Sequence, residues 1–144
     1  DMGMATAIDV GDSLDIHPKN KVVPAHRFVL WALAKEDGRD VECEGPLLKG
    51  VRVKGEKMVL SFKNAKGLYV KSDSGVKSDT GVRYLMIAGE DGVYHPAQSK
   101  IEKGKLVAWS PSVPRPVHIK YCTEDYCRGT IYNEADLPAY PFEW

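Results

Sequence analysis

The chain has 144 residues, of which 43% are hydrophobic, and its mean hydropathy of -0.33 is typical of an ordinary globular domain. Twenty basic and twenty acidic residues give a formal net charge of zero, which argues against a protein built mainly to hold nucleic acid or an anionic membrane. No stretch approaches the roughly 20 consecutive apolar residues of a membrane span. The length suits one domain, or one small domain with an attached piece of another.

The first part of the chain predicts a strand, a loop and a helix in that order. Residues 5–10 predict a short strand, residues 11–21 a polar loop and residues 22–37 a helix. Gly38 follows as a plausible C-cap. The apolar residues of the helix line one face at helical spacing: Val22, Ala25, Val29, Ala32 and Leu33.

Beyond Gly38 the hydrophobic period changes from 3.6 to 2, as in strands. Turn residues at 54–57, 89–92 and 103–104 separate the apolar runs, and the Ser/Asp/Gly-rich residues 72–81 predict an exposed loop. We expect strands at 51–53, 58–62, 68–70, 83–88, 99–102, 105–109 and 117–121. Many short strands with frequent turns favour a mostly antiparallel β-sandwich of about 100 residues.

Two further residue sets leave alternatives open. The three cysteines are an odd count, so Cys122 and Cys127 either pair across a short loop in an oxidising compartment or, like Cys43, pack as free thiols. The aromatic residues of the second part either form a platform for stacking sugars or belong to the core, and their alternation with aliphatic residues favours the core. These aromatic residues are Tyr69, Tyr84, Tyr94, Trp109 and Tyr121.

The loop at residues 11–21 carries the residues most suited to chemistry. Asp15 and His17 are two positions apart, and Pro18 stiffens the turn that follows. A carboxylate this close can accept the imidazole Nδ1 proton and leave Nε2 as a general base. A solvated turn is the commoner role of such a pair. One histidine and one carboxylate do not make a metal site, so we expect neither a metal nor a cofactor.

A family resemblance begins in this loop. The run Asp15-Ile16-His17-Pro18-Lys19-Asn20-Lys21 resembles the last catalytic block of the sialate O-acetylesterase family, which are SGNH-type carbohydrate acetylesterases. The similarity extends over almost the whole chain. It includes residues 3–5, 8–12, 32–34, 88–92, 96–97, 131–133, 137–139 and 141–142.

The resemblance implies a serine esterase mechanism. In that family a serine attacks the acetyl ester, a histidine is the general base, and an acidic residue orients the histidine. His17 matches the family histidine and Asp15 matches the acidic position, with Asp12 as the reserve candidate. SGNH hydrolases more generally place the acid three residues before the histidine, where this chain has Leu14.

The nucleophile and the oxyanion hole of the family lie in blocks far upstream, for which this chain has no room. Residues 11–14 spell G-D-S-L, the nucleophile motif of the same superfamily, but Ser13 lies only four residues before His17. A miniature hydrolase that uses Ser13 is therefore a third hypothesis, to be tested by Ser13→Ala. The chain resembles a C-terminal fragment, or the smaller chain of an enzyme cleaved into two.

The leading interpretation divides the chain into residues 1–38, a strand–loop–helix piece of an SGNH α/β hydrolase domain, and residues 39–144, the β-sandwich; the overall class is α+β. The chain would supply His17 and Asp15 to a Ser-His-Asp triad that hydrolyses O-acetyl esters on sugars, with the serine in a larger chain. The alternative is a non-enzymatic β-sandwich that binds carbohydrate or another domain. The resemblance also implies a secreted, lysosomal or periplasmic location.

Overall fold

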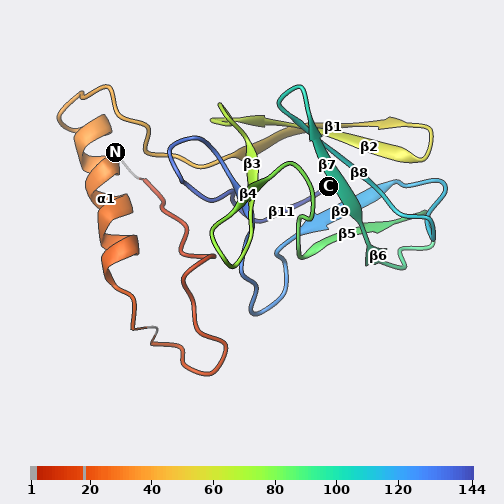
Figure 1. Ribbon diagram of the computed structural model, residues 1–144, viewed down its shortest axis with the longest axis horizontal. Helices are drawn as coiled ribbons and strands as arrows, with labels where there is room; N and C mark the ends of the chain where they lie inside the picture. The colour runs from red at the N-terminus through yellow and green to blue at the C-terminus, as the bar shows by residue number, and fades with distance from the viewer. Residues whose placement is uncertain (1–2, 18) are drawn as a thin grey trace.

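The computed structural model describes residues 3–17 and 19–144, with a helix at one end and the strands at the other (Figure 1). No helix in these residues is long and apolar enough to cross a membrane. The elements are α1 Val22–Lys35, β1 Leu47–Lys54, β2 Lys57–Lys63, β3 Tyr69–Lys71, β4 Lys77–Ser78, β5 Leu85–Ala88, β6 His95–Pro96, β7 Gln98–Glu102, β8 Lys105–Trp109, β9 His118–Tyr121, β10 Ile131–Tyr132 and β11 Phe142–Glu143.

The strands form three antiparallel sheets. Two are four-stranded, with the orders β1-β2-β8-β7 and β11-β9-β5-β6, and the third has the order β10-β3-β4. The last strand, β11, returns beside β9, where Phe142 is paired with Tyr121. The expectation of a mostly antiparallel sandwich therefore fits in part, because the strands divide among three sheets.

The predicted hairpins are confirmed at the turns that join neighbouring strands. Lys54 is paired with Lys57, and the two-residue loop between β1 and β2 begins at Gly55 with φ +59°. Lys103 and Gly104 connect β7 to β8 with φ values of 49° and 72°. Positive φ at both central residues matches the twist of the flanking strands, which explains the short loop. The predicted loop at 72–81 contains the two-residue strand β4.

One hydrophobic core joins all three sheets. Met58 from β2, Leu106 from β8, Ile87 from β5 and Ile131 from β10 are completely buried in it. Tyr121 is also completely buried, whereas Tyr84 is 36% exposed. The aromatic residues considered for a sugar platform are thus not on one surface, and the expectation that they favour the core holds for Tyr69 and Tyr121.

The predicted strand at residues 5–10 is wrong. The Val10 N–H donates to the Ala7 carbonyl and closes a turn, and the Thr6 carbonyl accepts a hydrogen bond from the Arg27 guanidinium. A strand needs a neighbour to pair its backbone groups, and here other partners already take them. The expected α+β class, with a strand–loop–helix piece of an SGNH α/β hydrolase domain at its start, is therefore wrong in that first part.

The predicted helix is confirmed as α1, and the chain leaves it at Gly38. Gly38 has φ +65°, and the Arg39 N–H reaches back across it to the Leu33 carbonyl. A residue with this φ is strained unless it is glycine, so the sequence position of the C-cap follows from sterics. The apolar face expected for this helix is largely exposed, with Val22 78% and Val29 53% accessible to solvent.

The C-terminal segment joins the helical part to the sheets. The completely buried Asn133 side chain donates to the Glu44 and Asn64 carbonyls, and its Oδ1 accepts from the Leu137 N–H. The Tyr140 hydroxyl donates to the Met4 carbonyl. These contacts give a structural role to the tail motifs that resemble the esterase family.

All three cysteines are buried free thiols. Burial, followed by the influence of the neighbouring Cys127 thiol, raises the pKa of Cys122. The second of the two sequence alternatives, thiols that pack, is the one that this structure displays.

Candidate functional site

The predicted catalytic pair lies in an exposed loop. The Asp15 Oδ1 accepts the His17 backbone N–H at 2.8 Å, and it lies 3.7 Å from the His17 Nδ1. The two side chains are 50% and 80% exposed, respectively. The carboxylate therefore fixes the local turn and stands near the imidazole without a hydrogen bond to it. Pro18, the residue expected to stiffen this turn, lies outside the described residues.

The other loop candidates do not contact the histidine. Asp12 uses its Oδ1 to accept the Leu14 N–H at 2.9 Å, which makes a second small turn. Among the described residues, no hydrogen bond joins the exposed Ser13 to His17. Asp15 is thus the carboxylate that this chain places beside His17, and the G-D-S-L spelling does not produce a serine–histidine pair here.

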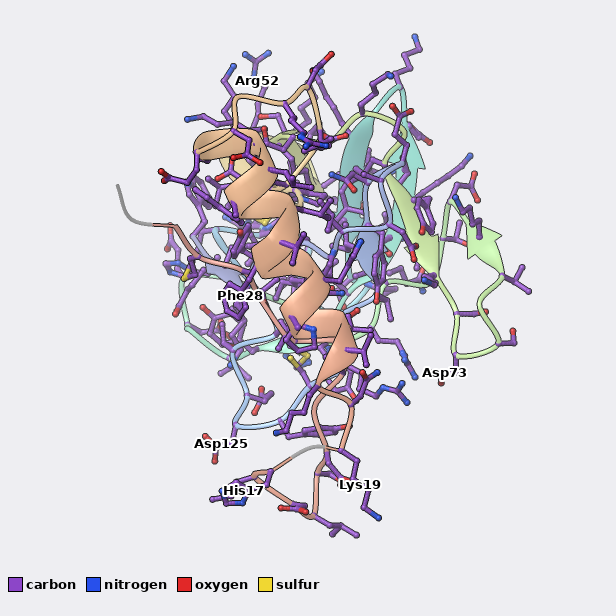
Figure 2. All side chains as sticks on the ribbon, turned by 90° about the vertical axis from the view of Figure 1, so that its left-hand side faces the viewer. His17, Lys19, Phe28, Arg52, Asp73 and Asp125 are labelled. Carbon is purple, nitrogen blue, oxygen red and sulfur yellow. The ribbon has the colours of Figure 1, made fainter. Side chains whose placement is uncertain are left out.

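The loop extends beyond the end of α1, away from the sheets. Figure 2 shows His17 and Lys19 below the helix, at the far end of the molecule from Arg52. Leu14 and Ile16, which flank Asp15, are 96% and 90% exposed. The loop that bears the candidate catalytic pair therefore exposes two large aliphatic side chains to solvent.

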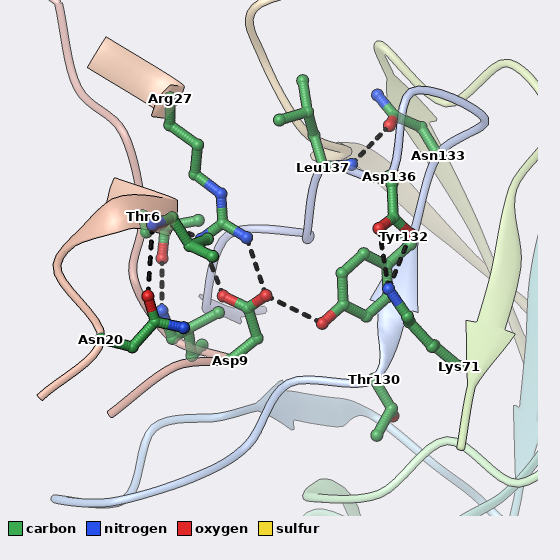
Figure 3. Close-up of polar contacts among 12 residues, drawn as sticks. Thr6, Asp9, Asn20, Arg27, Lys71, Thr130, Tyr132, Asn133, Asp136 and Leu137 are labelled. Carbon is green, nitrogen blue, oxygen red and sulfur yellow. Dashed lines mark hydrogen bonds and ion pairs between the residues drawn. The ribbon is translucent and has the colours of Figure 1, made fainter. Parts of the chain in front are cut away.

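A buried ion pair fixes the segment that precedes this loop. Arg27 on α1 donates from both terminal nitrogens to the two Asp9 carboxylate oxygens, each at 2.7 Å, and also to the Thr6 carbonyl at 2.7 Å (Figure 3). The Arg27 and Asp9 side chains are only 6% and 11% exposed. Such a planar, bidentate contact holds the segment before the loop in one orientation relative to the helix.

The sheet part of the protein joins the same network. The Tyr132 hydroxyl, at the end of β10, donates to Asp9 Oδ2 at 3.0 Å. Burial, and then the charge and hydrogen bond of Asp9, raise the pKa of Tyr132, so this phenol stays protonated and remains a donor. Asp9 is therefore the point at which the loop, the helix and the sheets meet (Figure 3).

A second polar cluster lies beside Tyr132. Lys71 donates to both Asp136 carboxylate oxygens at 2.8 and 2.7 Å, and the Tyr69 hydroxyl donates to the same carboxylate. Burial by itself would raise the pKa of Asp136, but the hydrogen bonds from Lys71 and Tyr69 outweigh it and lower the pKa. Asp136 is consequently a charged acceptor in the folded protein at neutral pH.

The Asp9–Arg27 pair, Tyr132 and the Lys71–Asp136 pair line an open cleft between α1 and the sheet part. Its volume is about 470 Å³. The cleft has acidic and basic side chains on its walls, and Arg83 is paired with Asp73 at 2.6 Å. Arg128 also lines it and, within the described residues, forms no ion pair. The cleft therefore combines paired charges and apolar side chains with the Arg128 guanidinium.

The structure does not bring the predicted site residues into this cleft. Its lining includes Asp9, His26 and Arg27 but not Asp15 or His17. Sequence reasoning missed the cleft because its residues come from five separate segments. The weak signals available were the resemblance of residues 8–12 and 131–133 to the esterase family, which mark Asp9 and Tyr132.

In the described part of the chain, no group of three or more His, Cys, Asp or Glu residues is arranged to hold a metal ion.

One solved structure is similar to almost the whole chain. It is the crystal structure of XAC1771, described as a novel carbohydrate acetylesterase from Xanthomonas citri, with 31% sequence identity and a TM-score of 0.85. The match covers 97% of this chain and 32% of that chain, so this chain spans about a third of the length of the esterase. No protein-family model matches the chain. No curated protein matches it either.

The chain is therefore related in sequence and structure to one part of a carbohydrate acetylesterase. The relationship reaches the N-terminal loop and α1 as well as the sheets, because the match leaves out only 3% of this chain. The finer resemblance to the sialate family belongs to the proposal that follows.

Proposed function

We propose that this chain is the C-terminal portion, or the small chain, of a carbohydrate O-acetylesterase of the sialate type. Residues 1–38 belong to the catalytic part, and residues 39–144 brace it. A larger polypeptide segment carries the serine nucleophile, and an acetylated sugar is the substrate. The observation that carries the proposal is the 31% identity to a carbohydrate acetylesterase over 97% of this chain.

In this proposal His17 is the general base. Its imidazole takes the proton of the serine hydroxyl as the oxygen attacks the acetyl carbonyl, and returns that proton to the leaving sugar oxygen. Water then hydrolyses the acetyl-enzyme by the same route in reverse. The exposure of His17 supports this role, because a serine from another segment has open access to Nε2.

Asp15 is the residue proposed to orient His17. Its Oδ1 is 3.7 Å from Nδ1, so a small rotation about the imidazole χ angles makes the hydrogen bond that a working triad needs. Contacts of this kind often tighten only when the substrate is bound. The proposal also includes a secreted, lysosomal or periplasmic location, which rests on the family resemblance alone.

Acetate release from acetylated sugars by the complete gene product that contains this chain tests the proposal. His17→Ala should lower kcat/KM by at least about a hundredfold, because general acid–base catalysis contributes that much or more. His118→Ala, at an exposed histidine on β9, is the matched control and should leave kcat/KM unchanged. Equal activities of the two variants would refute the role of His17.

A second candidate function is a non-enzymatic module that binds carbohydrate. The observation in its favour is the polar cleft of about 470 Å³ between α1 and the sheets, which His17 does not line. Titration with free and acetylated glycans separates the two functions. Saturable binding without acetate release supports the binding module, whereas turnover that requires His17 supports the esterase.

A further inference from the structure

The helix α1 is apolar on two opposite faces. Its inner face contains the buried Arg27 and the half-buried Val23, Leu30, Trp31 and Ala34. Five exposed apolar residues on the other side of the helix form what we call the outer stripe: Val22, which also lines the cleft at the start of the helix, Ala25, Phe28, Val29 and Ala32. A helix that is apolar around most of its circumference is normally buried between two layers.

The outer stripe is exposed in this chain. Val22, Phe28 and Val29 are 78%, 58% and 53% accessible, and Ala25 and Ala32 are exposed as well. In the view of Figure 2 the helix is the nearest element, and no other segment passes in front of it. The spacing of three and four residues along Val22, Ala25, Val29 and Ala32 is that of a surface that packs along a helix axis.

The apolar surface continues toward the candidate catalytic pair. Leu14 and Ile16 are 96% and 90% exposed, in the loop that precedes α1 and bears His17. A partner that presents a serine to His17 must approach this same end of the molecule. One covering segment can therefore bury the loop residues and the outer stripe together.

The similarity to the Xanthomonas citri esterase indicates which segment covers the outer stripe. The match with the Xanthomonas citri esterase uses nearly all of this chain but only 32% of that enzyme, so most of the esterase has no counterpart here. Resting on the proposed function, we infer that the outer stripe is the docking surface for the serine-bearing segment of the esterase. The ion pair between Arg27 and Asp9, together with the hydrogen bond from Tyr132 on β10 to Asp9, then ties this docked helix to the sheet part.

Thiol labelling of the complete gene product tests whether the stripe is covered. Val29→Cys places a thiol on the outer stripe, and Val53→Cys, at a valine that is 43% exposed on β1, is the matched control. The native cysteines are buried and set the background. We expect Val29→Cys to react at least about tenfold more slowly than Val53→Cys in the folded protein, and at the same rate in denaturant.

The identity of the occupant is tested with a photoreactive benzoylphenylalanine in place of Phe28, which is similar in shape. After illumination, mass spectrometry should find the cross-link in a peptide outside these 144 residues, within the segment that carries the serine. A cross-link to a second copy of this chain, or equal labelling rates at positions 29 and 53, would overturn the inference.

The two proposals fail in different ways. If both cysteine variants react equally fast while acetate release still depends on His17, the docking surface is wrong and the proposed function stands. If the stripe is protected by a segment of a longer protein that releases no acetate, the proposed function fails, and with it the identity of the occupant.

Discussion

Removal of the Asp9 carboxylate should destabilise the protein strongly, because it leaves the buried positive charge of Arg27 without a counter-charge. Arg27 is 6% exposed, and two of its three hydrogen bonds go to Asp9. Breaking a buried ion pair by removing one partner costs about 3–5 kcal/mol. We therefore expect Asp9→Ala to lower the free energy of unfolding by about 3–5 kcal/mol, and the melting temperature by about 6–20 °C for a domain of this size.

Urea unfolding followed by tryptophan fluorescence measures this loss. Trp31 lies on α1 and reports on the helix, whereas Trp109 on β8 reports on the sheets. Variants in which Trp31 or Trp109 is the single remaining tryptophan, with Trp144 also replaced, show whether Asp9→Ala releases the helix alone or unfolds the whole chain. Non-coincident transitions indicate that the helix separates first.

The matched control is an exposed acidic residue in a similar pair. Asp37 lies 3.9 Å from Arg39, with side-chain exposures of 58% and 65%, and such surface pairs contribute about 0–1 kcal/mol. Replacing both buried charges, as in Asp9→Leu with Arg27→Met, should recover most of the loss. A loss for Asp9→Ala no greater than for Asp37→Ala would refute the reasoning, because the pair would then be solvated.

Three further predictions concern the site, the junction and pH. If the proposed function holds, Asp15→Asn should reduce kcat/KM for acetate release by the complete gene product by at least about tenfold, while Asp12→Asn leaves it unchanged, and the reverse result would make Asp12 the acid. Gly45→Ala should cost about 1–3 kcal/mol in urea unfolding, because an added Cβ would clash with the Pro138 carbonyl oxygen, whereas at Gly50 it would make only an ordinary contact with Ser61 and cost less. The pKa of Asp136 is lowered in the folded state, so the stabilisation that this carboxylate contributes is present above the ordinary carboxyl pKa and is lost as the pH falls through the lower folded value. The difference in unfolding free energy between the parent and Asp136→Asn should therefore shrink between about pH 7 and pH 3. A constant difference would contradict this.

The exposed loop and the buried network have separate roles. The segment before the loop is held by contacts among Asp9, Arg27 and Tyr132. Asp15 and His17 lie in the loop itself and are exposed to solvent. Under the proposed function, this arrangement suits a histidine that meets a serine from another segment. The same division explains why stability and activity can be tested by different substitutions.

The sequence by itself determined the local elements. Turn residues such as Gly55 and Lys103-Gly104 fix hairpins because only a few residues adopt positive φ without strain, and Gly38 ends the helix for the same reason. The alternating apolar residues of β2 and β8 specify which faces are buried. The loop motif placed Asp15 and His17 together because they are two residues apart.

Only the tertiary structure decided which groups meet across the chain. Residues 5–10 have the pattern of a strand, but a strand forms only beside a partner, and here Arg27 and a turn take the backbone groups instead. Asp9 and Tyr132 are far apart in sequence, and nothing in either segment predicts their hydrogen bond. Helical spacing showed that Val22 and Val29 share a face, but whether that face is covered depends on what packs against it, which periodicity does not contain.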